Sequence, residues 1–113
     1  MANLKLPDPL ARRHLLEGDL SKDKARAYGE AYVAAGRPVE AIDFLEIGDA
    51  RDTLSALQKE ALEQGDAFLM RVSSGALGED PGSELWTRLA EKAESLGREQ
   101  DAETARRLAT VGD

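Results

Sequence analysis

The sequence has no cysteine and a single histidine, His14. Without cysteine, the chain cannot form a disulfide scaffold or a zinc or iron–sulfur site that needs thiolate ligands. One histidine also excludes a metal site that needs two imidazole ligands. We therefore expect no metal and no cofactor. The lack of cysteine fits a reducing compartment, so the expected location is cytoplasmic.

Residues that favour β-strands are scarce. Valine and isoleucine together occur six times and aromatic residues make up 4% of the chain, whereas alanine occurs 18 times and leucine 16 times. Alanine, leucine, glutamate and arginine favour helices, while β-branched and aromatic residues favour strands. The composition therefore predicts an all-α fold. No apolar run approaches the ~20 residues that a membrane-spanning helix needs, so no membrane partner is expected.

Positive charge is also in short supply, because 15 lysines and arginines face 22 aspartates and glutamates, for a net charge of −7. An acidic chain repels phosphate backbones, so no nucleic-acid partner is expected. The 113 residues are 42% hydrophobic, which is enough to build one continuous core. We therefore predict a single α-helical domain over residues 1–113.

Turn-forming residues divide the chain into about seven short helices. Asp8 before Pro9, Ser21 and Asp49 are placed to cap helix N-termini, and glycines are placed to end helices. The fifth helix is expected to stop near Ser73-Ser74-Gly75, because the stretch 75–82 holds three glycines and a proline and is predicted as a loop. The predicted helices cover 9–17, 21–36, 38–48, 49–65, 67–72, a segment from Asp80-Pro81 or Ser83 to Gly97, and 99–109.

Three of these helices carry apolar stripes that recur along the chain. The stripes begin at Ala25, Leu54 and Trp86, which are 29 and 32 residues apart. In each copy the glycine that closes the helix comes eleven residues later, at Gly36, Gly65 and Gly97. A two-helix repeat of about thirty residues is typical of a helical solenoid, in which stacked hairpins form the core.

At this point the sequence resembles the tetratricopeptide repeat, whose pattern combines large residues, a turn glycine and a small alanine in the second helix. The first copy is Tyr28-Gly29-x-x-Tyr32-x-x-x-Gly36-x-x-x-x-Ala41-x-x-x-Leu45. The last copy is Trp86-x-x-Leu89-Ala90-x-x-Ala93-x-x-x-Gly97-x-x-x-x-Ala102. In the middle copy Met70 stands where the small alanine belongs.

The resemblance implies antiparallel helical hairpins at 21–48, 49–75 and 81–110, with residues 8–20 as an N-terminal capping helix. A HEAT-like α-solenoid and a plain helical bundle remain open as alternatives.

In tetratricopeptide proteins the first helix of each pair lines a groove that binds peptides or partner helices, and this resemblance supplies the candidate site. Six of the twelve corresponding positions are acidic and two are basic, so a basic peptide or partner segment is expected. The alternative is that a chain of charge −7 shows acidic residues on any exposed face. Besides Val33 and Leu62, the positions are Asp23, Arg26, Glu30, Asp52, Ser55, Lys59, Glu84, Thr87, Glu91 and Glu94.

No constellation in the sequence points to catalysis. His14 is interpreted as a partly exposed helix residue, the serines lack a nearby base, and Arg106 and Arg107 are interpreted as surface charges. Glu79, Asp80 and Glu84 do not have the spacing of a calcium loop. We therefore expect a protein–protein interaction module that is not an enzyme. The alternatives are a structural, self-associating protein, for instance a homodimer, and an accessory domain of a larger complex.

Overall fold

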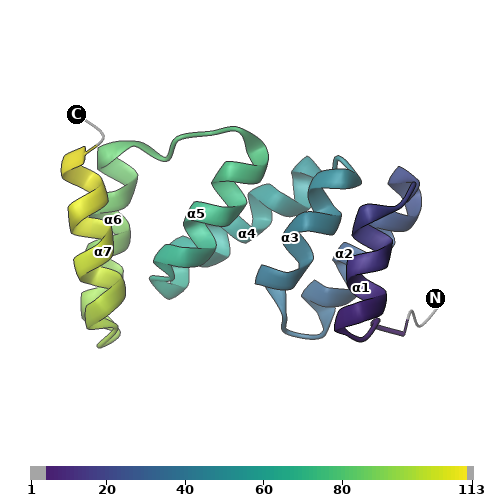
Figure 1. Ribbon diagram of the computed structural model, residues 1–113. Coiled ribbons are helices and arrows are strands. Elements are labelled where there is room, and N and C mark those ends of the chain that lie inside the picture. Colours follow the sequence, from purple (N-terminus) through teal and green to yellow (C-terminus); the bar gives the residue numbers. More distant parts are fainter. Residues whose placement is uncertain (1–4, 112–113) are drawn as a thin grey trace. The chain divides into compact units, whose positions relative to one another are not determined.

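The computed structural model describes residues 5–111, and every element in that range is an α-helix (Figure 1). The all-α prediction is confirmed. Residues 1–4 and 112–113 of the predicted domain lie outside the described residues. The helices are α1 (Pro9–Glu17), α2 (Lys22–Ala34), α3 (Pro38–Ile47), α4 (Arg51–Gln64), α5 (Ala67–Leu77), α6 (Gly82–Ser95) and α7 (Glu99–Val111).

The chain forms two compact units that divide between Leu54 and Ser55, inside α4. The N-terminal unit holds α1, α2, α3 and the start of α4, and the C-terminal unit holds the rest of α4 with α5, α6 and α7. Within the described residues, no helix is both long and apolar enough to cross a membrane.

Two of the three predicted N-caps are confirmed. Asp8 accepts a hydrogen bond from the amide of Ala11, and Ser21 accepts one from the amide of Lys24. The third, Asp49, is wrong, because α4 begins at Arg51 and Asp49 has a left-handed backbone with φ of 52°. Asp49 instead closes α3, since the amide after it, that of Ala50, donates to the carbonyl of Leu45.

The fifth helix is longer than predicted, and the expected stop near Ser73-Ser74-Gly75 is wrong. It continues to Leu77, and Gly78 ends it in a left-handed conformation with φ of 70°. Both serines are buried and have hydrogen-bond partners there: Ser73 donates to the carbonyl of Leu69 at 2.7 Å. Ser74 accepts from Gln58 Nε2 at 3.0 Å. The predicted loop 75–82 therefore shrinks to residues 78–81.

The three predicted turn glycines, Gly36, Gly65 and Gly97, share one geometry. Their φ values are 76°, 64° and 75°. In each turn the amide after the glycine donates to the carbonyl five residues earlier, over 2.9, 2.9 and 2.8 Å. This is the Schellman arrangement, which satisfies the last carbonyls of a helix and needs a left-handed residue. The repeating pattern of the sequence is thus a repeating turn geometry.

The core of the N-terminal unit forms where α2 packs on α3. Tyr32 and Phe44 are buried and stack with ring centroids 5.5 Å apart. Gly29 lies so close to Leu45 that a Cβ at that glycine would be 2.5 Å from the leucine Cδ2 atom. α1 has no buried residue. It is attached through Arg12, which donates to the backbone carbonyl of Glu40 on α3 at 2.8 Å.

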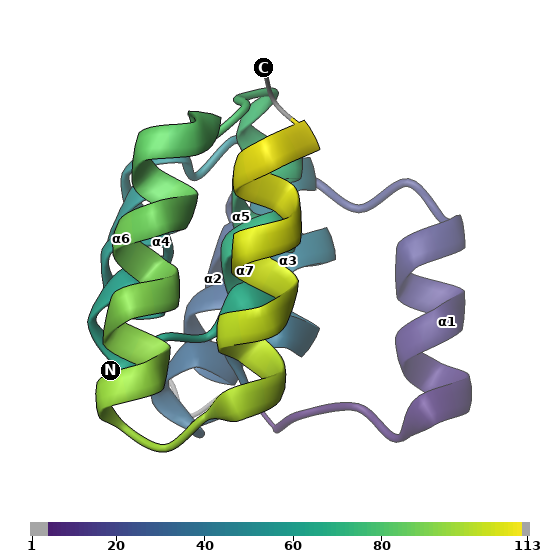
Figure 2. The ribbon, with the colours of Figure 1, turned by 90° about the vertical axis from the view of Figure 1, so that its left-hand side faces the viewer.

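The core of the C-terminal unit joins residues of all four of its helices. Leu69 and Met70 of α5 and Leu89 of α6 are almost fully buried there. α6 and α7 lie side by side as a helical hairpin (Figure 2). Alanines at Ala90 and Ala105 allow this close packing, since small side chains let helix axes approach.

Candidate partner-binding groove

An open groove of about 700 Å³ runs between α6 and α7, entirely within the C-terminal unit. Because its walls come from one hairpin, its geometry depends only on how these two helices pack. Its lining residues are Thr87, Ala90, Glu91, Glu94, Ser95, Arg106, Ala109 and Thr110.

Helical spacing explains why these side chains share one hollow. On α6, Thr87, Glu91 and Glu94 follow one another at intervals of four and three residues. Arg106 and Ala109 lie three residues apart on α7, so each set occupies one face. The alanines supply an apolar floor and the longer polar side chains supply the rim.

The hydroxyl groups of the groove have their protons directed into their own helices. Thr87 donates to the carbonyl of Ser83 at 2.8 Å, Ser95 to that of Lys92 at 2.7 Å, and Thr110 to that of Arg107 at 2.8 Å. A hydroxyl that donates in this way can still accept hydrogen bonds through its oxygen. Toward a ligand, these three side chains therefore act as acceptors.

Charge in the groove is unbalanced. Glu94 forms an ion pair with Arg106, whereas Glu91 forms none with any described residue. Among the described residues, no cation therefore pairs with the carboxylate of Glu91. Glu84 lies one turn before Thr87 on α6, is exposed and also lacks an ion pair among residues 5–111.

In the N-terminal unit the predicted site residues bind one another. Arg26 donates to Glu30 at 3.0 Å along α2 and to both carboxylate oxygens of Asp52 at 3.0 and 2.7 Å. The hydrogen bond from Arg26 lowers the pKa of Asp52, and the bonds to Asp52 and Glu30 raise the pKa of Arg26. These three side chains therefore tie α2 to the first turn of α4.

The remaining predicted positions do not line the groove. Asp23 is an exposed acidic residue in the first turn of α2, where a negative charge favours the helix dipole. Ser55 is half-buried and Lys59 is exposed, both on α4. Of the ten predicted site residues, the α6/α7 groove gathers Thr87, Glu91 and Glu94.

Sequence reasoning missed the contribution of α7. It treated Arg106 as an ordinary surface charge and assigned only the first helix of each pair to the binding face. In the structure Arg106 and Thr110 form the opposite wall of the groove. The signal for this wall is the position of Arg106 directly after Ala105, a fully buried residue of the α7 stripe, so that Arg106 lies at the edge of the helix interface.

The other residues considered for chemistry are dispersed. His14 is exposed on α1, more so than the partly exposed position expected from the sequence. Glu79 accepts a hydrogen bond from Gln58 Nε2 at 3.3 Å. Over residues 5–111 there is no group of three or more histidine, aspartate or glutamate side chains that could hold a metal ion.

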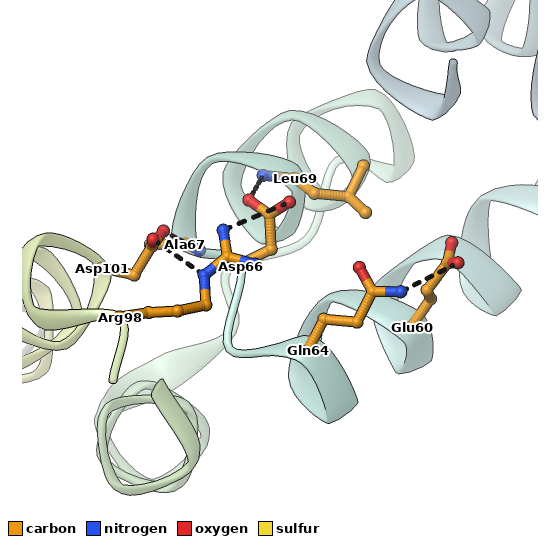
Figure 3. A network of polar contacts seen from close by, with 7 residues as sticks. All are labelled: Glu60, Gln64, Asp66, Ala67, Leu69, Arg98 and Asp101. Carbon is orange, nitrogen blue, oxygen red and sulfur yellow. Dashed lines mark hydrogen bonds and ion pairs between the residues drawn. The ribbon is translucent and has the colours of Figure 1, made fainter. Parts of the chain in front are cut away.

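A second polar network joins the start of α7 to the start of α5 (Figure 3). Asp101 accepts a hydrogen bond from the amide of Ala67 at 2.9 Å, and Asp66 accepts one from the amide of Leu69 at 3.0 Å. Arg98 contacts both carboxylates, at 3.1 Å to Asp101 and 4.0 Å to Asp66. Two carboxylates therefore cap α5, one of them supplied by α7.

Comparisons with protein-family models, curated proteins and solved structures find no match to this chain. The interpretation of the groove therefore depends on its own geometry and charge. An apolar floor bordered by hydrogen-bond acceptors suits a ligand with an apolar side chain and several N–H donors.

Proposed function

We propose that this protein is a non-catalytic protein–protein interaction module whose α6/α7 groove binds a basic segment of a partner. The observation that carries the proposal is the acceptor-rich lining of the groove. Three hydroxyls donate into their own helices and one carboxylate, that of Glu91, has no partner among the described residues. Arginine and lysine offer only donors and match such a lining.

Binding combines a modest apolar contribution with electrostatic selection. Ala90 is only 3% exposed, so the apolar contribution comes mainly from half-buried Ala109, at about 25 cal/mol for each Å² removed from water. Glu91 attracts a positively charged side chain and speeds its approach. The Glu94–Arg106 pair is half to two-thirds exposed, at 67% and 55%, so rearranging it for an incoming cation costs little.

The proposal keeps three of the ten predicted binding residues, Thr87, Glu91 and Glu94, in the binding face. Arg26, Glu30 and Asp52 hold two helices of the N-terminal unit together, so they are assigned a structural role. The three shared glycine turns support helical hairpins of the tetratricopeptide type as the proposed architecture. The cysteine-free sequence supports a reducing compartment, the cytoplasm, as the proposed location.

The test is a titration of a fluorescent arginine-rich peptide with the full chain, followed by anisotropy. Glu91→Lys is expected to weaken binding about tenfold, equivalent to ~1.4 kcal/mol, because it replaces attraction by repulsion at the rim. The matched control is Glu63→Lys, an exposed position on α4 that does not line the groove. Equal weakening by both variants would mean that only net charge matters, and it would overturn the assignment of the groove.

A further inference from the structure

A second surface of the C-terminal unit presents an exposed aromatic ring beside two arginines. Phe68 on α5 is 56% exposed. It borders a shallow hollow of about 270 Å³ between α5 and α7, together with Arg71 and Arg107. We call Phe68, Arg71 and Arg107 the Phe68 patch.

The two arginines of the Phe68 patch have no carboxylate partner within residues 5–111. Neither Arg71 nor Arg107 forms an ion pair with a described residue, although acidic residues outnumber basic ones by 22 to 15. Six other arginines do hold a carboxylate, namely Arg12, Arg13, Arg26, Arg37, Arg98 and Arg106. An aromatic residue flanked by unpaired arginines has the composition of a binding hot spot.

The backbone that carries Phe68 is fixed by capping contacts before any partner binds. Phe68 lies between Ala67 and Leu69, whose amides are capped by Asp101 and Asp66 (Figure 3). Arg98 links these two carboxylates. The first turn of α5 is thereby attached to α7, which carries Arg107. A surface ordered in advance loses less entropy on binding.

The patch and the groove are complementary in both charge and hydrogen bonding. The patch offers an apolar ring and guanidinium donors, while the groove offers an apolar floor and acceptors. The oppositely charged members of each lining, Arg106 in the groove and Asp101 beside the patch, are already engaged by Glu94 and Arg98.

We infer that the partner of the groove is a second copy of this chain, whose Phe68 patch docks into it. The ring of Phe68 lies on the alanine floor, and Arg71 approaches the unpaired carboxylate of Glu91. This inference rests on the proposed function of the groove and names its partner.

Such an association is head-to-tail. Arg106 lines the groove and the next residue, Arg107, belongs to the patch, so α7 carries the two surfaces on different faces. A copy that uses its patch keeps its own groove free. Heterologous contacts of this kind produce rings or open chains rather than a symmetric dimer.

Sedimentation velocity of the full chain over a concentration series at physiological ionic strength tests the inference. The weight-average sedimentation coefficient of the wild type is expected to rise with concentration. Arg71→Glu and Glu91→Arg should each stay monomeric alone. Mixed in equal amounts they should associate, because one retains an intact groove and the other an intact patch. Phe68→Ala should weaken association about tenfold or more.

Lys22→Glu supplies a control, since it makes the same charge change as Arg71→Glu at an exposed residue of α2 outside both surfaces. It should associate like the wild type. Equal loss in Lys22→Glu and Arg71→Glu, or a wild type that is monomeric throughout, would overturn the inference. The peptide titration is made at protein concentrations where the chain is monomeric, because self-association would occupy the same groove. A protein that is monomeric throughout but still binds the basic peptide would leave the proposed function standing.

Discussion

Gly65 lies directly against the backbone of Ala93: a Cβ atom at position 65 would come within 2.6 Å of the Ala93 Cα atom. The two residues belong to successive copies of the repeat, one at the turn after α4 and the other on the stripe of α6. Gly65 also has a left-handed backbone, with φ of 64°. Two independent constraints, conformation and space, therefore require glycine at this position.

Gly65→Ala is expected to destabilise the C-terminal unit by more than about 3 kcal/mol, because left-handed strain of ~1–2 kcal/mol adds to a backbone clash. Gly36→Ala and Gly97→Ala provide the comparison, since both glycines have positive φ but open space where a Cβ would lie. The Gly36→Ala and Gly97→Ala variants should therefore lose only the stability that corresponds to the left-handed strain. Urea denaturation measures all three variants, and equal losses would contradict the close approach to Ala93.

Met70→Ala is expected to destabilise the protein by about 2–5 kcal/mol, although it restores the small residue of the repeat pattern. Met70 is almost fully buried in the core of the C-terminal unit, so truncation leaves a cavity. Met70→Leu keeps most of the volume and should cost less than about 1.5 kcal/mol. A Met70→Ala protein as stable as the wild type in urea would show that α5 collapses onto the smaller residue.

Asp101→Ala is expected to cost about 1–2 kcal/mol, because the amide of Ala67 loses its cap and Arg98 loses a carboxylate. Asp101→Asn keeps a side-chain oxygen for the amide of Ala67 and should cost less. Glu103→Ala, at an exposed position of the same helix, serves as the control and should lie within about 0.5 kcal/mol of the wild type. Thermal unfolding measures the stability of the three variants. If Asp101→Ala lost no more stability than Glu103→Ala, Asp101 would have no capping role.

The Arg26–Asp52 contact predicts a specific pH dependence. The hydrogen bond from Arg26 lowers the folded-state pKa of Asp52 below 3.8. The stability that the ionised Asp52 adds to the folded state is therefore complete above the unfolded-state pKa, and it is lost as the pH falls through the folded-state pKa. The stability difference between wild type and Asp52→Asn should therefore shrink between about pH 6 and about pH 2. Urea midpoints across this range measure it, and a difference independent of pH would contradict the contact.

Local features of the fold could be predicted because their causes are local. Asp8 and Ser21 cap amides three residues away, and Gly36 and Gly97 supply the left-handed residue that a Schellman turn needs. Both depend on near neighbours along the chain. Asp49 shows the limit, because capping the next helix and closing the previous one use the same residue types.

The candidate site was only partly predictable, because its contacts join residues distant along the chain. Glu91 and Glu94 were predicted from the resemblance, but the opposite wall from Arg106 required the packing of α7 on α6. In the same way, the pairing of Arg26 with Asp52 spans 26 residues and turns two predicted binding residues into a helix contact. A charge pattern along the chain does not specify which charges neutralise one another.

The sequence by itself determined an all-α chain of short hairpins, because helix propensity, apolar spacing and glycine turns act over a few residues. The absence of cysteine and the single histidine exclude thiolate and two-imidazole metal sites, and the acidic net charge argues against a nucleic-acid partner. Only the tertiary structure decided that Ser73 and Ser74 continue α5, that Gly65 lies against Ala93, and that Arg71 and Arg107 beside Phe68 form no ion pair with another described residue. Those outcomes depend on burial and on distances between helices, which no short stretch of sequence contains.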